Sequence, residues 1–159
     1  MSLGSIALWG FFATVVLTTL MEGGQGLGFS RMSLPLMLGA AFTSHRGRAS
    51  VIGFVIHLVN GWVFALVYGC AFESLHRATW WLGAIFGLVQ ALFVLVAFMP
   101  LFPYVHPRMA SETFGPNPTR QLEPPGFMAL NYGRSTPVIA VVAHVLYGAI
   151  LGGFYTLAR

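Results

Sequence analysis

The chain has 159 residues, of which 57% are hydrophobic and only 8% are charged, and its net charge is +4. Soluble domains carry roughly a quarter charged residues, so this composition excludes an ordinary soluble fold. The eight basic residues are all arginines and are scattered along the chain, which argues against a nucleic-acid partner. The length suits one membrane domain that covers residues 1–159.

Four apolar stretches approach the length of roughly 20 residues that crosses the hydrocarbon core of a bilayer. They cover residues 3–21, 50–72, 80–102 and 137–157. The first stretch lacks the positive start and the small-residue cleavage site of a secretory signal, so we expect it to be retained. The sequence therefore predicts an all-α integral membrane protein with four transmembrane helices.

Two connections between these stretches are long. Residues 32–42 are apolar, too short to span a membrane and interrupted by Pro35, which predicts a short interfacial helix. Residues 103–136 contain six prolines and show no helical periodicity, which predicts a loop outside the bilayer. The positive-inside rule places both long connections in the cytoplasm and both termini outside, because the first and third connections between the stretches hold six of the eight arginines: Arg31, Arg46, Arg48, Arg108, Arg120 and Arg134.

The second and fourth apolar stretches are similar to each other. When 51–69 is aligned with 138–156, a histidine, a glycine and a tyrosine coincide, namely His57 with His144, Gly61 with Gly148, and Tyr68 with Tyr155. A weaker match joins 3–10 to 81–87. We therefore expect two tandem hairpins, at about 3–72 and about 80–158, in the same orientation and related by an axis along the membrane normal.

The repeated residues lie on one face of each helix, because positions i, i+4 and i+11 fall within about 40° of one another at 3.6 residues per turn. Small residues extend each face and allow close approach of helices in lipid. We expect the second and fourth transmembrane helices to pack along these faces. The candidate packing residues are Gly53, Gly61, Ala65, Tyr68, Ala140, Gly148, Gly152 and Tyr155.

The first apolar stretch has a polar face of its own, made of Gly10, Thr14, Thr18 and Glu22. Threonine hydroxyls within a helix bond to the preceding turn, so this face indicates helix packing. We expect Glu22, at the end of the stretch, to be solvated.

Ionisable residues inside a membrane span are functional candidates, and His57 and His144 are the two clear cases. One interpretation is structural, with each imidazole bonding between helices. A second is a b-type haem with both histidines as axial ligands of its iron, since a parallel duplication supplies two ligands at one depth. A chlorophyll-type pigment is a third, and a proton or ion path through His57, His144, Glu22 and Tyr68 is a fourth. Asn60 and Gln90 are further polar candidates.

No other feature indicates catalysis or a metal site. His45, His76 and His106 fall in predicted loops, where we expect them to be solvated, and Cys70 has no partner cysteine. The chain contains no HExxH, CxxC, GxSxG or phosphate-binding glycine motif. We therefore expect a protein that is not an enzyme.

The phrases HLVNGWVFALVYG and HVLYGAILGGFY, with FATVVLTTLM, SLPLMLG and FMP, resemble a family of small bacterial four-helix membrane proteins of unknown function that have duplicated HxxxG helices. The resemblance covers most of the transmembrane part and excludes the loop at 103–136. It implies the four-helix architecture and both histidine faces, and it implies no activity. We accordingly expect the inner membrane of a bacterium as the location.

The sequence favours an accessory or structural subunit of a larger membrane complex. The small-residue faces suit packing against lipid and other membrane subunits, and the proline-rich loop suits docking. Electron transfer through haem, or pigment binding, is the first alternative, and proton or ion transport is the second.

Overall fold

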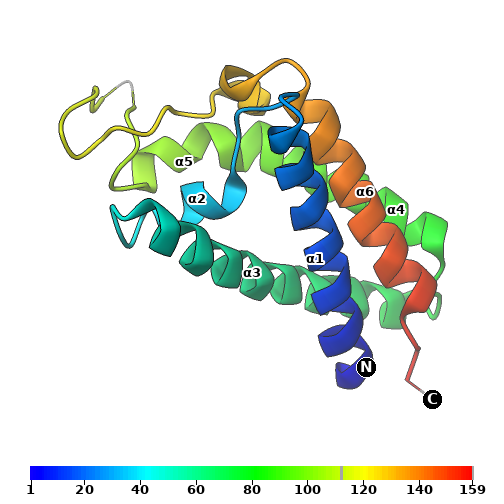
Figure 1. Ribbon diagram of the computed structural model, residues 1–159. Helices are drawn as coiled ribbons and strands as arrows, with labels where there is room; N and C mark the ends of the chain where they lie inside the picture. Colours follow the sequence, from blue (N-terminus) through cyan, green and yellow to red (C-terminus); the bar gives the residue numbers. More distant parts are fainter. Residues whose placement is uncertain (112, 159) are drawn as a thin grey trace.

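The computed structural model describes residues 1–111 and 113–158, which form helices joined by loops (Figure 1). In this part of the chain, four segments are long and apolar enough to span a membrane: α1 (Leu3–Gly26), α3 (Arg46–Ser74), the segment Trp80–Val105, and α6 (Thr136–Phe154). Trp80–Val105 comprises α4 (Trp80–Phe93), the π-helical η1 (Val94–Phe98) and α5 (Met99–Val105). The described connections contain the short α2 (Leu34–Gly39) and the 3-10 helix η2 (Phe127–Tyr132). The predicted all-α fold is confirmed, with four segments that are long and apolar enough to span a membrane.

The four spans form an open arc. α6 packs between α1 and α4, and α1 also packs against α3. α3 and α4 are consecutive in the chain, but their backbones stay apart along their length. Figure 1 shows α3 at an angle to the other spans, with α2 beside its first half. The two ends of the arc therefore face each other across space that side chains line from both helices.

Glycines allow the closest approaches between helices. A Cβ added at Gly83 of α4 would collide with the carbonyl oxygen of Gly148 of α6, and one at Gly148 would collide with that of Gly83. α4 and α6 therefore pack backbone against backbone, as small residues permit in lipid. Gly53 of α3 meets α2 in the same way, because its added Cβ would collide with the carbonyl oxygen of Pro35.

The predicted packing of the second span on the fourth along their repeated faces is wrong. The face of α6 lies against α4, whereas the face of α3 is divided between α2 and α1, where Gly61 meets Thr14. α3 and α6 meet chiefly through tyrosines: the Tyr147 hydroxyl donates to the carbonyl oxygen of Gly61 at 2.6 Å. All eight candidate packing residues are buried. Their glycines lie against these other partners, whereas Tyr68 contacts Tyr147 of α6 and Tyr155 contacts Phe72 of α3.

The third span changes its helical winding where proline interrupts it. Pro100 has no N–H to donate four residues back, which disrupts the regular ladder of hydrogen bonds. The N–H of Met99 instead donates to Val94, five residues back, and this is the π-helical pattern of η1. Pro103 lies inside α5, so the helix continues to Val105, beyond the expected start of the loop.

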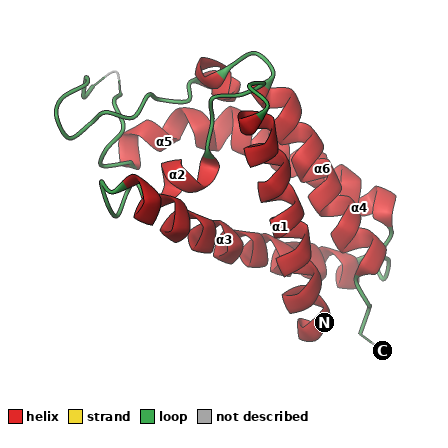
Figure 2. Cartoon of the chain, viewed as in Figure 1, coloured by secondary structure: helices red, strands yellow, loops and turns green. Residues whose placement is uncertain are grey.

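The long connection after α5 is anchored to the end of α1 (Figure 2). Arg31 forms an ion pair with Glu123 at 3.1 Å, and its backbone N–H donates to the carbonyl oxygen of Tyr132 at 2.7 Å. The Tyr132 hydroxyl donates to the carbonyl oxygen of Glu123 at 2.6 Å. Burial, with the Glu123 charge in the same direction, raises the pKa of Tyr132 to about 12. The described loop thus has one fixed attachment before η2, at Glu123, and another at the last residue of η2, Tyr132.

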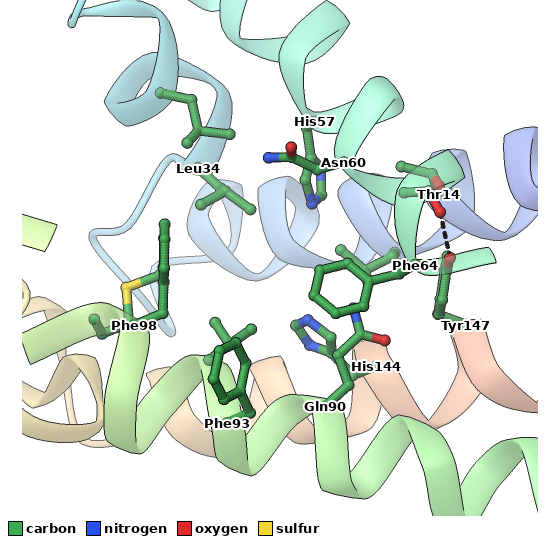
Figure 3. A pocket seen from close by; sticks show the side chains of 15 residues that line it. Thr14, Leu34, His57, Asn60, Phe64, Gln90, Phe93, Phe98, His144 and Tyr147 are labelled. Atoms are coloured by element: carbon green, nitrogen blue, oxygen red, sulfur yellow. Dashed lines mark hydrogen bonds between the residues drawn. The ribbon is translucent and has the colours of Figure 1, made fainter. Parts of the chain in front are cut away.

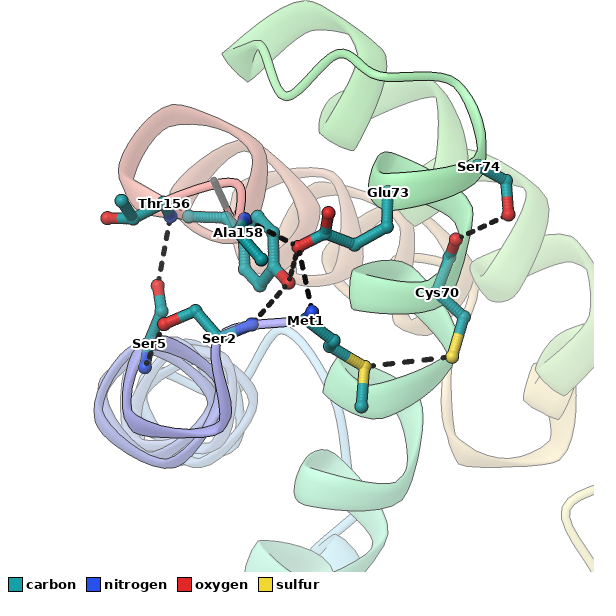
Figure 4. A network of polar contacts seen from close by, with 9 residues as sticks. Met1, Ser2, Ser5, Cys70, Glu73, Ser74, Thr156 and Ala158 are labelled. Carbon is teal, nitrogen blue, oxygen red and sulfur yellow. Dashed lines mark hydrogen bonds and ion pairs between the residues drawn. The ribbon is translucent and has the colours of Figure 1, made fainter.

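A polar cluster gathers the two ends of the chain at the opposite end of the molecule (Figure 4). One carboxylate oxygen of Glu73, near the end of α3, accepts hydrogen bonds from the Tyr155 hydroxyl at 2.8 Å and from the N–H of Ala158 at 2.9 Å. The amino group of Met1 lies 3.5 Å from the same oxygen. The start of α1, the end of α3 and the segment after α6 are therefore held together.

Candidate functional site

A cavity of about 240 Å³ lies between the two ends of the arc, and both intramembrane histidines line it (Figure 3). Every one of the helices α1 to α6 contributes to its wall. Most of the lining is apolar, including Phe64, Phe93 and Phe98. The polar lining residues are Thr14, His57, Asn60, Gln90, His144 and Tyr147.

His57 is oriented by a chain of hydrogen bonds along α1. The Thr18 hydroxyl lies 2.8 Å from the carbonyl oxygen of Thr14 and 2.9 Å from Nδ1 of His57. Because the hydroxyl donates its one hydrogen to Thr14, it accepts from the N–H at Nδ1 of His57. Nε2 of His57 then carries no hydrogen and offers a lone pair.

His144 has the same tautomer for a different reason. Its Nδ1 lies 2.8 Å from the carbonyl oxygen of Ala140, one turn earlier in α6, and a carbonyl can only accept. Nε2 of His144 is therefore also an acceptor. An unpaired charge is costly inside a membrane, and the described cavity lining holds no carboxylate, so both imidazoles are uncharged.

Both Nε2 atoms lack a hydrogen-bond partner within the described chain, although His57 is only 9% and His144 only 6% exposed. Two nearly buried acceptors from different helices thus face one cavity. Fixing one ring nitrogen in this way sets the tautomer and orientation of the ring and leaves the lone pair of the other nitrogen open.

Gln90 adds hydrogen-bond donors beside the histidines. The Tyr68 hydroxyl donates to Oε1 of Gln90 at 2.7 Å, which leaves the amide hydrogens of Gln90 unused. The Asn60 amide lines the same cavity (Figure 3). The site therefore offers acceptors on the imidazoles and donors on the amides.

An apolar groove of about 410 Å³ continues from the cavity along the opening between α3 and α4. The two spaces share Phe64, Gln90 and Phe93 as walls. Val67 on one side and Val89 on the other are 58% and 60% exposed, so the groove opens away from the protein interior.

The other candidate residues lie apart from the cavity. Glu22 is half-buried and accepts a hydrogen bond from the Ser33 hydroxyl at 3.1 Å, so the expectation that it is solvated is wrong. Tyr68 reaches the cavity only through Gln90, and Tyr155 belongs to the cluster around Glu73. Cys70, on the surface of α3, is exposed. The described residues contain no group of three or more His, Cys, Asp or Glu side chains that could hold a metal ion.

His106 is 2% exposed, so the expectation of a solvated loop histidine is wrong for this residue. Its Nε2 lies 3.0 Å from the carbonyl oxygen of Met37, and its Nδ1 accepts from the N–H of Arg108 at 3.2 Å. These bonds require the neutral ring with its hydrogen on Nε2. Burial lowers the pKa of His106, as do the charges of Arg108 and Arg120, against the opposing effect of the Met37 bond.

Three contributors to the site were missed from the sequence. The Thr18 hydroxyl orients His57, Tyr147 closes one wall, and the π-helical segment η1 places Val94 and Phe98 in the lining. The four-residue spacing of threonines was visible, and its bonds within α1 are confirmed. Their partner on α3 could not be read from one helix alone.

No known family model, no curated protein and no solved structure matches the chain. The resemblance to a family of small four-helix membrane proteins therefore stays a prediction, and the chemistry of the cavity is the basis on which a function can be proposed.

Proposed function

We propose that this chain is a membrane-embedded binding protein for a small lipid-soluble molecule, whose polar group is held by His57 and His144. One observation carries the proposal: two uncharged imidazoles on different helices present unpaired Nε2 acceptors to a single cavity. Each histidine is at most 9% exposed, and a nearly buried acceptor is stabilised by a hydrogen-bond donor. Two such acceptors in one cavity favour a guest that donates hydrogen bonds.

The surroundings of the histidines favour a guest that arrives from lipid. The cavity continues into an apolar groove between α3 and α4, and the outer walls of that groove are exposed. Apolar pockets with a few convergent polar groups are the usual form of small-molecule sites. Water is the competing occupant, because a polar cavity of this size can hold it.

The proposal is tested by extracting the protein with its surrounding lipid in polymer nanodiscs and identifying the small molecules that copurify by mass spectrometry. We expect a lipid-soluble molecule other than phospholipid in wild type, depleted at least about tenfold in the double variant His57→Ala with His144→Ala, if each lost bond is worth about 1 kcal/mol.

The matched control is His76→Asn, because His76 is exposed, lies outside the cavity and has a positive φ of 49° that asparagine tolerates. This control should carry the same guest as wild type. Identical small-molecule content in wild type and the double variant contradicts the proposal and favours water in the cavity.

Haem is the second candidate, because axial ligation would use the same two Nε2 lone pairs. The space fits it poorly. A cavity of about 150 Å³ holds one benzene ring, and this cavity of about 240 Å³ lies below the roughly 300 Å³ at which pockets for larger ligands begin. A chlorophyll-type pigment meets the same obstacle. A Soret band in the purified protein that His57→Ala or His144→Ala removes would favour haem over a single-ring guest.

The predicted proton or ion path receives less support. Glu22 lies outside the cavity lining, bonded to Ser33, and Tyr68 is separated from the histidines by Gln90.

An accessory role in a larger complex is compatible with ligand binding, since partners would contact outer helix surfaces. Mild-detergent extraction then yields an assembly with unrelated chains, and a stable isolated monomer would argue against that role.

We also propose the arrangement of the chain as two tandem hairpins, the membrane position of α2 and the orientation of the loops. Two tandem hairpins are supported by Gly61 lying against α1 while Gly148 lies against α4, each beside its histidine. The short α2 at 34–39 is proposed to lie near the membrane surface, and the long loops to face the cytoplasm of a bacterium.

A further inference from the structure

We infer that the guest is a hydroquinone carrying an alkyl chain, with its ring and hydroxyl groups in the cavity and its chain in the groove between α3 and α4. This inference rests on the proposed function and specifies its ligand. It depends on the tautomers of the histidines, the size of the cavity and the position of the groove.

The hydrogen-bonding groups of the cavity select hydroxyl groups. Nε2 of His57 and Nε2 of His144 can only accept, so the guest must donate to them. The amide hydrogens of Gln90 remain available because its Oε1 is bonded to Tyr68, so the guest must also accept. A hydroxyl does both, whereas the oxygen of a quinone, ester or ether only accepts.

The arrangement of the acceptors favours two hydroxyls on one rigid ring. His57 extends from α3 and His144 from α6, and the two rings face the cavity from different walls (Figure 3). A rigid ring with two hydroxyls can donate one hydrogen bond to each imidazole. Acceptors on two walls therefore favour a dihydroxybenzene, and hydroquinone is the member of that class with its hydroxyls on opposite sides of the ring.

The volume limits the head of the guest to one ring. The cavity of about 240 Å³ exceeds the roughly 150 Å³ in which benzene binds and lies below the roughly 300 Å³ where pockets for larger ligands begin. The aromatic side chains of Phe64 and Phe93 in its wall suit contact with a flat ring.

The groove supplies a place for an alkyl chain and excludes the commonest competing lipid. It shares Phe64, Gln90 and Phe93 with the cavity, so a chain attached to the ring can continue into it. Its other walls are apolar apart from Tyr68. A phospholipid headgroup is disfavoured, because no arginine lines the described walls of either space and two acceptor lone pairs would face its phosphate.

Isothermal titration calorimetry of wild-type protein in phosphatidylcholine nanodiscs tests the head group without any substitution. The probes are decylhydroquinone, kept reduced with ascorbate, and its 1,4-dimethyl ether, with empty nanodiscs as the blank. We expect the ether, which cannot donate, to bind at least tenfold more weakly. Equal binding of both probes overturns the inference.

Substitutions then locate each half of the ligand. His57→Ala and His144→Ala should each weaken the binding of decylhydroquinone about tenfold, since each removes one acceptor. Val89→Trp should fill the groove and weaken decylhydroquinone at least fivefold while leaving unsubstituted hydroquinone unchanged. Its control is Ile85→Trp, one turn earlier on α4, which is 49% exposed and lines neither space. Unchanged binding in both histidine variants, with retained helical circular dichroism, contradicts the inference.

Failure of the inference is distinguishable from failure of the proposed function. A histidine-dependent copurifying molecule without hydroxyl groups, together with absent hydroquinone binding, sustains the binding function and rejects this ligand. Absence of both rejects the two together. Retention of an ordinary phospholipid chain in the groove, unaffected by either histidine, also rejects the inference.

Discussion

At the scale of single residues, the site depends on which nitrogen of each imidazole carries the hydrogen. His57 owes its tautomer to Thr18, whose hydroxyl is already committed to the carbonyl oxygen of Thr14. His144 owes its tautomer to its own helix, through Ala140. The second arrangement is local and the first joins α1 to α3, so the two histidines differ in how easily a substitution disturbs them.

Thr18→Val tests this difference, because valine keeps the shape of threonine and removes the hydroxyl. We expect His57 to lose its fixed tautomer while His144 keeps it, as reported by the nitrogen-15 chemical shifts of the imidazoles. Decylhydroquinone binding should fall about tenfold, the effect of one misplaced acceptor. Thr14→Val is the control for the tautomer, since the Thr14 hydroxyl donates to Gly10 at 2.6 Å and does not bond to His57. A hydrogen on Nε2 of His57 in wild type would refute the assignment.

His106 predicts a dependence of stability on pH. Its pKa is lowered in the folded protein by burial and by the charges of Arg108 and Arg120, so the unfolded chain binds the proton more readily. The stability is therefore fully present above a pH of about 6.5, the ordinary value for histidine, and is lost as the pH falls toward the lower folded value.

His106→Phe should remove this part of the pH dependence, because phenylalanine keeps a ring and does not titrate. The measurement is the free energy of unfolding of both proteins between pH 4.5 and 8. We expect the wild-type curve to fall more steeply than that of the variant below about pH 6.5. Parallel curves would mean that the His106 pKa is the same in the folded and unfolded states.

At the scale of helices, the contact between α4 and α6 depends on glycines that approach each other's backbones. Gly83→Ala should destabilise the protein by about 1–3 kcal/mol, because its Cβ collides with the backbone of Gly148 and the helices must separate. The control is Gly153→Ala in α6, where a Cβ would meet the nearest atom, Cβ of Trp80, at an ordinary 3.5 Å. Unfolding of both variants in mixed micelles gives the comparison, and equal stability would contradict the close packing.

The sequence predicted the helices well and their neighbours poorly. Length and hydropathy identified four spans, and the four-residue spacing identified the faces that become buried. Most residues on every side of the spans are apolar, however, so periodicity does not say which buried face meets which helix. Which helices become neighbours depends on the complementary shapes of two surfaces, such as Gly148 against Gly83 or Gly53 against Pro35. No single helix sequence reveals this complementarity.

The same limit applies to the candidate site. His57 and His144 were identifiable because histidines are rare inside membrane spans. Their common cavity was not, since it requires α2 and η1 to fill the space beside them. Pro100 indicated a disturbed helix. The π-helical winding that places Phe98 in the cavity depends on which carbonyl oxygen accepts the N–H of Met99, and the sequence does not specify this.

At the scale of the whole molecule, the positive-inside rule predicts an orientation in the membrane. The cluster around Glu73 keeps both ends of the described chain on one side (Figure 4), and most arginines lie toward the other. In a Cys70→Ser background, Pro118→Cys should resist a membrane-impermeant maleimide in intact cells and react after lysis. Ser2→Cys should react in intact cells. The reverse pattern would invert the orientation.

The open arc also determines whether the occupancy of the site depends on the amount of guest per lipid or on its amount per volume of solution. Under the proposed function the groove opens to lipid, so a guest exchanges with the bilayer and never has to cross water. Occupancy then follows the mole fraction of the guest among the lipids, a surface density, and not its amount per volume of solution. Dissociation constants expressed in molar units should drift as the ratio of lipid to protein changes, while the same data expressed per lipid should fall on one curve.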